Sequence, residues 1–270
     1  FDRIRVHVRS CRWGVLGGWY VQPDVLMPST EAMVLQSVVG LNYFERVFGV
    51  RPTVANCFDS FGHGAGLPQI LKLSGHLMYL HARPGLDVPV PRGLYRWRGV
   101  DGTEIMAVNQ VAGHYGTHPT AEGCRERVML SMDWFRRQAG HPRLLLWGYG
   151  NHGGGASDEA IAWMEAENRR PEREVTYLFS TAEAYRQACE SVDPATVPVH
   201  EGEVKKVFAG CYTSLARLKR LYRRAETAYF TTEKLCAWAS NRGVMAYSGG
   251  AFSGALKKGL FRQVYDILAG

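Results

Sequence analysis

The arrangement of apolar and polar positions predicts a well-defined helix over residues 29–48. Its apolar side chains recur at intervals of three and four, and they are Met33, Val34, Val38, Leu41 and Phe44. That spacing places them on one face of a helix. Either Ser29 or Thr30 supplies the side-chain oxygen that caps the first turn, and Gly49 supplies the residue that ends the helix.

Shorter apolar runs, bounded by turn residues, predict strands that alternate with further helices. The expected strands are residues 15–21, 50–58, 77–80, 94–97, 104–108, 144–147 and 176–179. Helical patterns cover residues 122–139, 157–167 and 180–191, and Pro68 suits the first turn of another helix. Asp101-Gly102 predicts a hairpin. Strands that alternate with helices are typical of a parallel α/β sheet or barrel.

The pattern changes after a proline-containing linker at residues 193–198. Residues 216–241 predict one long amphipathic helix in which basic and acidic residues are interleaved. Gly249 and Gly250 interrupt the pattern, and a last helical segment is expected to begin near Leu256. We therefore expect an α/β part followed by a helical part.

Composition supports a globular protein and argues against a nucleic-acid partner. The chain has 270 residues, of which 46% are hydrophobic and 21% charged, so it can bury a sizeable core. Its net charge of +7 is compatible with binding to polyanions. However, the basic residues are scattered, and the densest run, at residues 219–224, is interrupted as on a solvated helix face. A basic nucleic-acid-binding protein remains an alternative that rests on net charge alone, and we expect no nucleic acid partner.

The cysteines and the apolar runs predict a location inside the cell. The six cysteines are widely spaced and include no C-x-x-C pair, which is typical of reduced thiols in a cytoplasmic protein. No run of about 18 apolar residues is present, so no membrane partner is expected. The chain begins at Phe1 without a methionine or a signal-like segment, which suggests that its start is missing.

The stretch from Asn56 to Leu71 carries the strongest indication of chemistry. It predicts a strand that ends on an acid, a glycine-containing turn and a helix. Catalytic and binding groups collect at the carboxyl ends of strands in α/β folds. Asp59 is therefore either a functional carboxylate or an aspartate that caps the loop. Gly62 places His63 in a loop, where it is expected to be a structural hydrogen-bonding residue rather than a metal ligand.

A second glycine-rich turn, at residues 148–155, contains Asn151 and His152. It lacks the Gly-Lys-Ser/Thr ending of a P-loop and the spacing of a dinucleotide-binding fingerprint. Phosphate binding is therefore not expected there. The remaining histidines form no set with metal-ligand spacing, and structural roles are expected for them.

Several motifs, taken in order, resemble glycoside hydrolase family 38, the α-mannosidases, and the resemblance covers nearly all of the chain. The matching segments are Gly17-Gly18-Trp19-Tyr20-Val21-Gln22-Pro23-Asp24, Met27-Pro28-Ser29-Thr30-Glu31-Ala32, Asp59-Ser60-Phe61-Gly62-His63, Leu67-Pro68-Gln69-Ile70-Leu71, Arg83-Pro84, Asp101-Gly102, the loop at 150–155, Glu201-Gly202-Glu203, and Gly210-Cys211-Tyr212-Thr213-Ser214 followed by Lys219-Arg220, Arg223-Arg224 and Glu226.

The resemblance implies a fold and an activity. The family fold is a seven-stranded β/α barrel followed by an α-helical, three-helix bundle. Residues 1–195 would form part of the barrel, whose first strand is expected to be missing, and residues 200–270 part of the bundle. The implied activity is a retaining α-mannosidase that acts on an α-mannoside or a mannose-containing oligosaccharide with the help of zinc. Whether the protein forms an oligomer stays open.

The resemblance also assigns roles to residues of this chain. Asp59 matches the nucleophile, which in the family also binds zinc, and the chemistry suits a carboxylate that forms a glycosyl-enzyme. Phe61 would line the sugar subsite, Arg83 would hydrogen-bond near the nucleophile, and Asp266 would contact a sugar hydroxyl.

The chain departs from the family pattern in three places. Two of them, Tyr265 and Asn151, favour a second interpretation, whereas the intact Asp59 loop and Arg83 disfavour it. No His-x-Asp pair precedes residue 24, although the family takes two zinc ligands from such a pair. Tyr265 stands where the last histidine ligand is expected, and tyrosine is a poor zinc ligand at neutral pH. Asn151 replaces an acid in the glycine loop, where the family places its general acid, and an amide cannot protonate a leaving group. The alternative is thus a degenerate, zinc-deficient member that is inactive or only binds mannosides.

Overall fold

The chain folds around one mixed β-sheet that is flanked by helices. The computed structural model describes residues 1–83, 89–109, 120–136, 140–148, 154–204 and 207–269. The strands are β1 (Val54–Asn56), β2 (Met78–His81), β3 (Gly93–Arg98), β4 (Glu104–Asn109) and β5 (Val199–Glu201). They lie in the order β1-β2-β4-β3-β5. Strands β1, β2 and β4 run parallel, β3 is antiparallel to β4, and β5 is parallel to β3.

The expected hairpin is confirmed in the pair β3–β4. Its turn contains Gly102 at φ +82°, a left-handed conformation that glycine adopts without steric cost. The side chain of Asp101 accepts a hydrogen bond from the backbone amide of Thr103 at 3.1 Å, which closes the turn.

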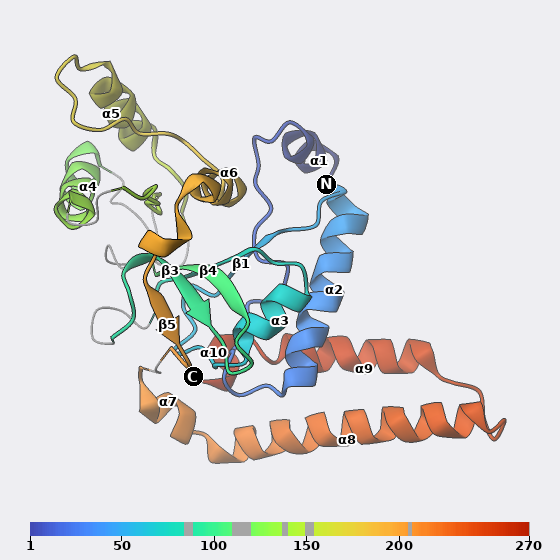
Figure 1. The fold of residues 1–270 in the computed structure, drawn as a ribbon. Helices are drawn as coiled ribbons and strands as arrows, with labels where there is room; N and C mark the ends of the chain where they lie inside the picture. Colours follow the sequence, from blue (N-terminus) through green and yellow to red (C-terminus); the bar gives the residue numbers. More distant parts are fainter. Residues whose placement is uncertain (84–88, 110–119, 137–139, 149–153, 205–206, 270) are drawn as a thin grey trace.

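Both faces of the sheet are covered, so successive strand residues are buried on opposite sides. The helices near the sheet are α2 (Thr30–Phe48), α3 (Leu67–Leu73) and α6 (Ala182–Ala188). In Figure 1, α2 and α3 lie on one side of the sheet and α6 on the other. The core on the α2–α3 side includes Ala55, Tyr79, Tyr95, Trp97 and Ala107. The core on the α6 side includes Val54, Met78, Leu80, Leu94, Val108 and Tyr185.

Helix starts follow the signals that the sequence provides. Ser29, Ser157 and Thr181 each accept a hydrogen bond from the first turn of their helix. Gly49 ends α2 at φ +70°, and Pro68 lies in the first turn of α3. The N-terminal residues form the helix α1 (Asp2–Arg9). Two helices that pack on each other, α4 (Ala121–Arg136) and α5 (Asp158–Arg169), enclose a separate small apolar cluster.

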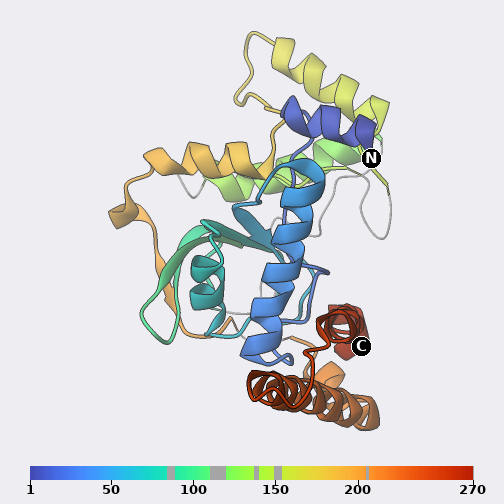
Figure 2. The same cartoon turned by 90° about the vertical axis from the view of Figure 1, so that its right-hand side faces the viewer.

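The C-terminal part is helical, as expected. The elements are the short helices η1 (Cys189–Ser191), η2 (Pro194–Thr196), α7 (Ala209–Thr213) and α10 (Tyr265–Leu268), and the long helices α8 (Ala216–Asn241) and α9 (Gly249–Phe261). Figure 2 shows α8 and α9 together at the foot of α2. Helix α9 begins at Gly249, so the expected start near Leu256 is wrong. Packing of Phe252 on Tyr229, with ring centroids 6.0 Å apart, outweighs the low helix propensity of the glycines.

The expected strand over residues 15–21 is also wrong. Gly17 and Gly18 have φ angles of +100° and +84°, which break an extended strand. The segment instead packs closely against α2, because a Cβ added at Gly40 would lie 2.3 Å from the carbonyl oxygen of Gly18. These glycines therefore mark a close approach of two backbones rather than a strand.

Residues 144–147 and 176–179 are irregular, although both were expected to be strands. Leu144 contributes to the core under α6, whereas Leu145 and Trp147 contribute to the α4–α5 cluster, so this run bridges two cores. At Tyr177, the side chain of Asn168 bonds both the backbone N–H, at 2.8 Å, and the backbone carbonyl, at 2.9 Å. Asn168 thereby satisfies the backbone groups of Tyr177 that a neighbouring strand would otherwise bond.

The fold class is α/β, as the sequence predicts, with a mixed sheet of five strands among the described residues. None of the described helices is long and apolar enough to cross a membrane.

Candidate functional site

The parallel pairing of β1 and β2 brings Asp59 and Arg83 together. Both residues lie just beyond the carboxyl end of their strand, and the two strands are neighbours, so the two loops meet at one edge of the sheet. The backbone amide of Arg83 donates to the carbonyl of Phe58 at 3.1 Å, which fixes the register of these loops. Arg83 Nε donates a hydrogen bond to Asp59 Oδ1. The two side chains are 27% and 20% exposed, so the pair is open to a ligand.

Two aromatic rings enclose the guanidinium of Arg83. Its central carbon lies 5.6 Å from the ring centroid of Phe61 and 5.2 Å from that of Phe208. The two rings contact each other edge to face, 5.2 Å apart. Both faces attract a cation, so they stabilise the guanidinium next to the carboxylate. Phe208 adopts φ +53°, which is unusual for an aromatic residue and shows that the surrounding contacts outweigh its backbone preference.

Hydrogen bonds from other segments hold the loop that carries Asp59. Ser60 Oγ donates to the carbonyl of Pro23 at 2.9 Å. The backbone N–H and carbonyl of His63 pair with those of Val204, both at 2.9 Å. The position of Asp59 is therefore fixed on both sides by segments far away in the sequence.

His63 is buried and hydrogen-bonded, which confirms the structural role that the sequence predicts. Its Nε2 lies 2.8 Å from the carbonyl oxygen of Arg83, and its Nδ1 lies 2.8 Å from the hydroxyl of Tyr79. Burial lowers the pKa of His63 to about 4, so its imidazole is neutral at pH 7. His81 also contacts the Arg83 carbonyl, at 2.8 Å, and burial holds its pKa well below the usual value.

The remaining predicted site residues lie on the C-terminal helix α10 or outside the described residues. Tyr265 is 6.1 Å from Phe61 between ring centroids, so the structure brings α10 to the same site. Asp266 is exposed on α10 beside it. Asn151 and His152 lie outside the described residues. Asp59, Phe61, Arg83 and Tyr265 are thus gathered in one place.

A family model matches most of the chain. The model of the glycosyl hydrolases family 38 N-terminal domain matches residues 1–203. The chain belongs to glycosyl hydrolase family 38. Human α-mannosidase 2C1 is 26% identical over 280 residues, which cover 100% of this chain and 26% of that protein. The α-mannosidase G of Dictyostelium discoideum is 26% identical over 279 residues, covering 100% of this chain and 25% of its own. The chain therefore spans about a quarter of the length of these curated relatives.

Solved structures show the same fold. An α-mannosidase from Enterococcus faecalis V583 matches with a TM-score of 0.81 and 20% identity, covering 100% of this chain and 32% of that chain. A second glycosyl hydrolase family 38 protein from Enterococcus faecalis matches with a TM-score of 0.70 and 17% identity, covering 100% of this chain and 29% of its own. At these sequence identities, the similarity to the solved structures shows the fold alone.

Within this family 38 chain, the described residues do not by themselves fit a zinc ion. No group of three histidine, cysteine, aspartate or glutamate side chains is close enough to hold a metal within the described ranges. Asp59 is a carboxylate ligand in type, and its carboxylate accepts a hydrogen bond from the cation Arg83, whose guanidinium lies over the ring of Phe61.

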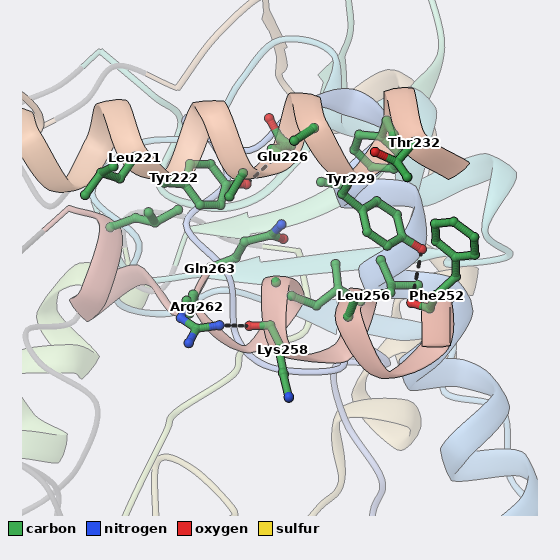
Figure 3. A pocket seen from close by; sticks show the side chains of 18 of the residues that line it. Leu221, Tyr222, Glu226, Tyr229, Thr232, Phe252, Leu256, Lys258, Arg262 and Gln263 are labelled. Atoms are coloured by element: carbon green, nitrogen blue, oxygen red, sulfur yellow. Dashed lines mark hydrogen bonds between the residues drawn. The ribbon is translucent and has the colours of Figure 1, made fainter. Parts of the chain in front are cut away.

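A cavity of about 720 Å³ lies between α8 and α9 and reaches α10. Figure 3 shows that Tyr222, Tyr229, Phe252 and Leu256 line it. Its walls are largely apolar, and Glu226 is already bonded to the hydroxyl of Tyr222 at 2.7 Å and to the amide of Ser29 at 3.0 Å. A sugar buried there would leave hydroxyls unpaired, so this cavity is not suited to a sugar.

Sequence reasoning missed Phe208, Tyr79, Tyr95 and His81 as residues that surround the site. His81 ends β2 directly before the loop of Arg83, and this position was a signal that could have been used. Phe208 offered no local signal, because only the tertiary contact with Arg83 brings it to the site.

Proposed function

We propose that this chain is part of a retaining α-mannosidase in which Asp59 is the nucleophile. The observation that carries the proposal is the Asp59–Arg83 pair, which lies at the carboxyl edge of the sheet in a chain of family 38. Its substrate would be a terminal α-linked mannose of a small mannoside or an oligosaccharide.

The proposed reaction has two steps. The Asp59 carboxylate attacks the anomeric carbon, a carbon–oxygen bond forms, and the bond to the leaving-group oxygen breaks as that oxygen takes up a proton. Water then attacks the anomeric carbon of the glycosyl-enzyme and gives up a proton, which replaces the one consumed in the first step. The carbon–oxygen bond to Asp59 breaks, mannose is released and the carboxylate is free again. Arg83 orients the carboxylate by its hydrogen bond to Oδ1, and Phe61 provides an apolar face for the sugar ring.

The other family properties enter as parts of the same proposal. They are a zinc ion, for which Asp59 would be one ligand and which would stabilise charge on the sugar, a contact of Asp266 with a sugar hydroxyl, a seven-stranded barrel in residues 1–195, and a helical bundle in residues 200–270. A cytoplasmic location is proposed from the cysteines, all six of which are free in the structure.

The test is trapping of the glycosyl-enzyme in the full-length protein. A 5-fluoro-mannosyl fluoride, which forms the intermediate faster than it is hydrolysed, should add one mannosyl group to the peptide that contains Asp59, as seen by mass spectrometry. Asp59→Asn should abolish labelling and turnover of an aryl α-mannoside. The control is Asp101→Asn, because Asp101 lies in the exposed hairpin turn and should leave both unchanged.

Two results would overturn the proposal. Label on another carboxylate would exclude Asp59 as the nucleophile. Mannoside binding without turnover would favour the degenerate interpretation. Metal analysis of the same protein, with and without Tyr265→His, tests zinc, because a histidine facing the metal should raise zinc affinity. Unchanged affinity would place Tyr265 outside the metal site.

A further inference from the structure

A buried row of hydrogen bonds converges on the main-chain carbonyl of Arg83. His63 Nε2 and His81 Nδ1 both lie 2.8 Å from this oxygen. On the far side of each ring, Tyr79 Oη lies 2.8 Å from His63 Nδ1, and Tyr95 Oη lies 2.7 Å from His81 Nε2. The row therefore runs from one tyrosine hydroxyl through two imidazoles and one carbonyl to a second tyrosine hydroxyl.

The chemistry of the groups fixes the direction of each bond. A carbonyl oxygen only accepts, so the imidazole nitrogens that face Arg83 both carry hydrogen: Nε2 of His63 and Nδ1 of His81. A neutral imidazole has one N–H, so the opposite nitrogens accept, and the hydroxyls of Tyr79 and Tyr95 donate. The two histidines are thus held in opposite tautomers.

Burial and neighbouring rings support neutral histidines. The side chains of His63, His81, Tyr79 and Tyr95 are fully buried. The two imidazoles lie 4.9 Å apart between centroids, and the ring of His63 also faces Trp97 at 6.3 Å. Burial lowers the pKa of both histidines and raises the pKa of both tyrosines, so each group keeps the protonation state that the row requires.

This row acts on the residue that contacts Asp59. The amide of Arg83 is held by the carbonyl of Phe58 at 3.1 Å, and its carbonyl is held by both imidazoles. Because both backbone groups of Arg83 are fixed, its side chain extends toward the carboxylate of Asp59 from a fixed position.

We infer that His63 and His81, each oriented by its tyrosine, are positioning residues that fix the main chain of Arg83 and thereby place its guanidinium on Asp59. The inference rests on the proposed function, because it assigns these residues a task in the same site.

The test compares four forms of the full-length protein with an aryl α-mannoside: the wild type, Tyr79→Phe/Tyr95→Phe, Arg83→Gln and their combination. Without the hydroxyls, each imidazole keeps its N–H toward the carbonyl of Arg83 but loses the donor to its far nitrogen, so the ring is held from one side only. The Tyr79→Phe/Tyr95→Phe variant should lose about tenfold in kcat with KM within about twofold. In the Arg83→Gln background, the same two substitutions should change kcat less than about twofold, because they act through Arg83.

A merely structural role would give a different result. The two substitutions would then lower kcat by the same factor in both backgrounds, and this outcome would overturn the inference. Tyr185→Phe is the matched control, because Tyr185 is a buried tyrosine of the other core whose hydroxyl bonds the carbonyl of Pro142 at 3.4 Å. It should leave kcat unchanged. If the double variant does not fold, Tyr95→Phe alone provides the same comparison.

A structural measurement separates this inference from the proposed function. Absence of α-mannoside turnover in the wild-type protein would overturn the proposed function. Crystal structures of the wild type and of Tyr79→Phe/Tyr95→Phe would then decide the inference. The guanidinium of Arg83 should leave Asp59 in the variant, and a guanidinium that stays on Asp59 would overturn the inference.

Discussion

Arg83 donates a hydrogen bond to the carboxylate of Asp59, and the two residues meet because β1 and β2 are adjacent and parallel. Each side chain follows the carboxyl end of its strand, so the contact comes from the sheet topology rather than from proximity in sequence. The rings of Phe61 and Phe208 then cover the guanidinium. The pair is consequently well oriented but still partly exposed.

Replacement of Arg83 tests the importance of this pair. Arg83→Gln in the full-length protein should lower kcat for an aryl α-mannoside by about 100-fold, since it removes a preorganised charged donor at the proposed nucleophile. Arg98→Gln is the control, because Arg98 also pairs with carboxylates, Glu104 and Glu201, but on the exposed end of β3. Equal losses in the two variants would contradict a special role for Arg83.

Protonation of His63 should make stability depend on pH. Because its pKa is lowered from 6.5 to about 4, the unfolded chain takes up the proton first as the pH falls. The stabilisation from the neutral ring is complete above pH 6.5 and is lost progressively down to about pH 4, by roughly 3 kcal/mol in total. Thermal melts between these pH values should show this loss.

Two histidine variants check the source of that pH dependence. His63→Gln should flatten the decrease of Tm with falling pH, although His81 still contributes part of it. His7→Gln should leave the decrease unchanged, since His7 is exposed on α1. The same dependence of Tm on pH in the wild type, His63→Gln and His7→Gln would exclude His63 as the origin of the pH dependence.

Two glycines in helices should respond in opposite ways to alanine. Gly40→Ala places a Cβ 2.3 Å from the carbonyl oxygen of Gly18, so α2 must move, and we expect a loss of about 1–3 kcal/mol in the free energy of unfolding. Gly254→Ala in α9 meets no atom within 4 Å and should stabilise by about 0.5–1 kcal/mol. Denaturant unfolding of the two variants measures both changes, and a neutral Gly40→Ala would contradict the close approach.

The side chain of Gln36 should be a strong stability determinant. It donates to the carbonyl of Leu260 at 2.9 Å and accepts from the amide of Val21 at 3.1 Å, and it is fully buried. Gln36→Leu leaves these backbone groups unpaired and should cost about 2–4 kcal/mol, measured by denaturant unfolding. Gln187→Leu removes an exposed glutamine and should change the stability by less than about 0.5 kcal/mol. A similar loss of unfolding free energy in Gln36→Leu and Gln187→Leu would show that the buried hydrogen bonds of Gln36 do not determine stability.

Local signals predicted most of the helices. Ser29 and Gly49 delimit α2, and the bounds of α8 agree with its amphipathic pattern, because caps and apolar periodicity act within a few residues. Local signals gave the wrong secondary structure where a side chain outside the segment bonds its backbone. Tyr177 was expected in a strand because its neighbours are apolar, but the side chain of Asn168 satisfies its backbone.

The candidate site was predictable only in part. Asp59 could be singled out because an acid followed by glycine-containing turns at the end of a strand is a local pattern, and the family motifs added Phe61 and Arg83. Phe208 and Tyr95 could not be found in this way. Their contacts with Arg83 and His81 join segments far apart in the sequence.

The sequence alone determined the α/β class, the acid at the end of β1 and the long C-terminal helix, because each depends on interactions between residues close along the chain. Tertiary structure decided which strands pair, and thus that Arg83 lies on Asp59. It also decided that two buried histidines with opposite tautomers hold the Arg83 carbonyl. Strand pairing and burial are set by the packing of the whole core, where each group must find its hydrogen-bond partner among residues that no local pattern identifies.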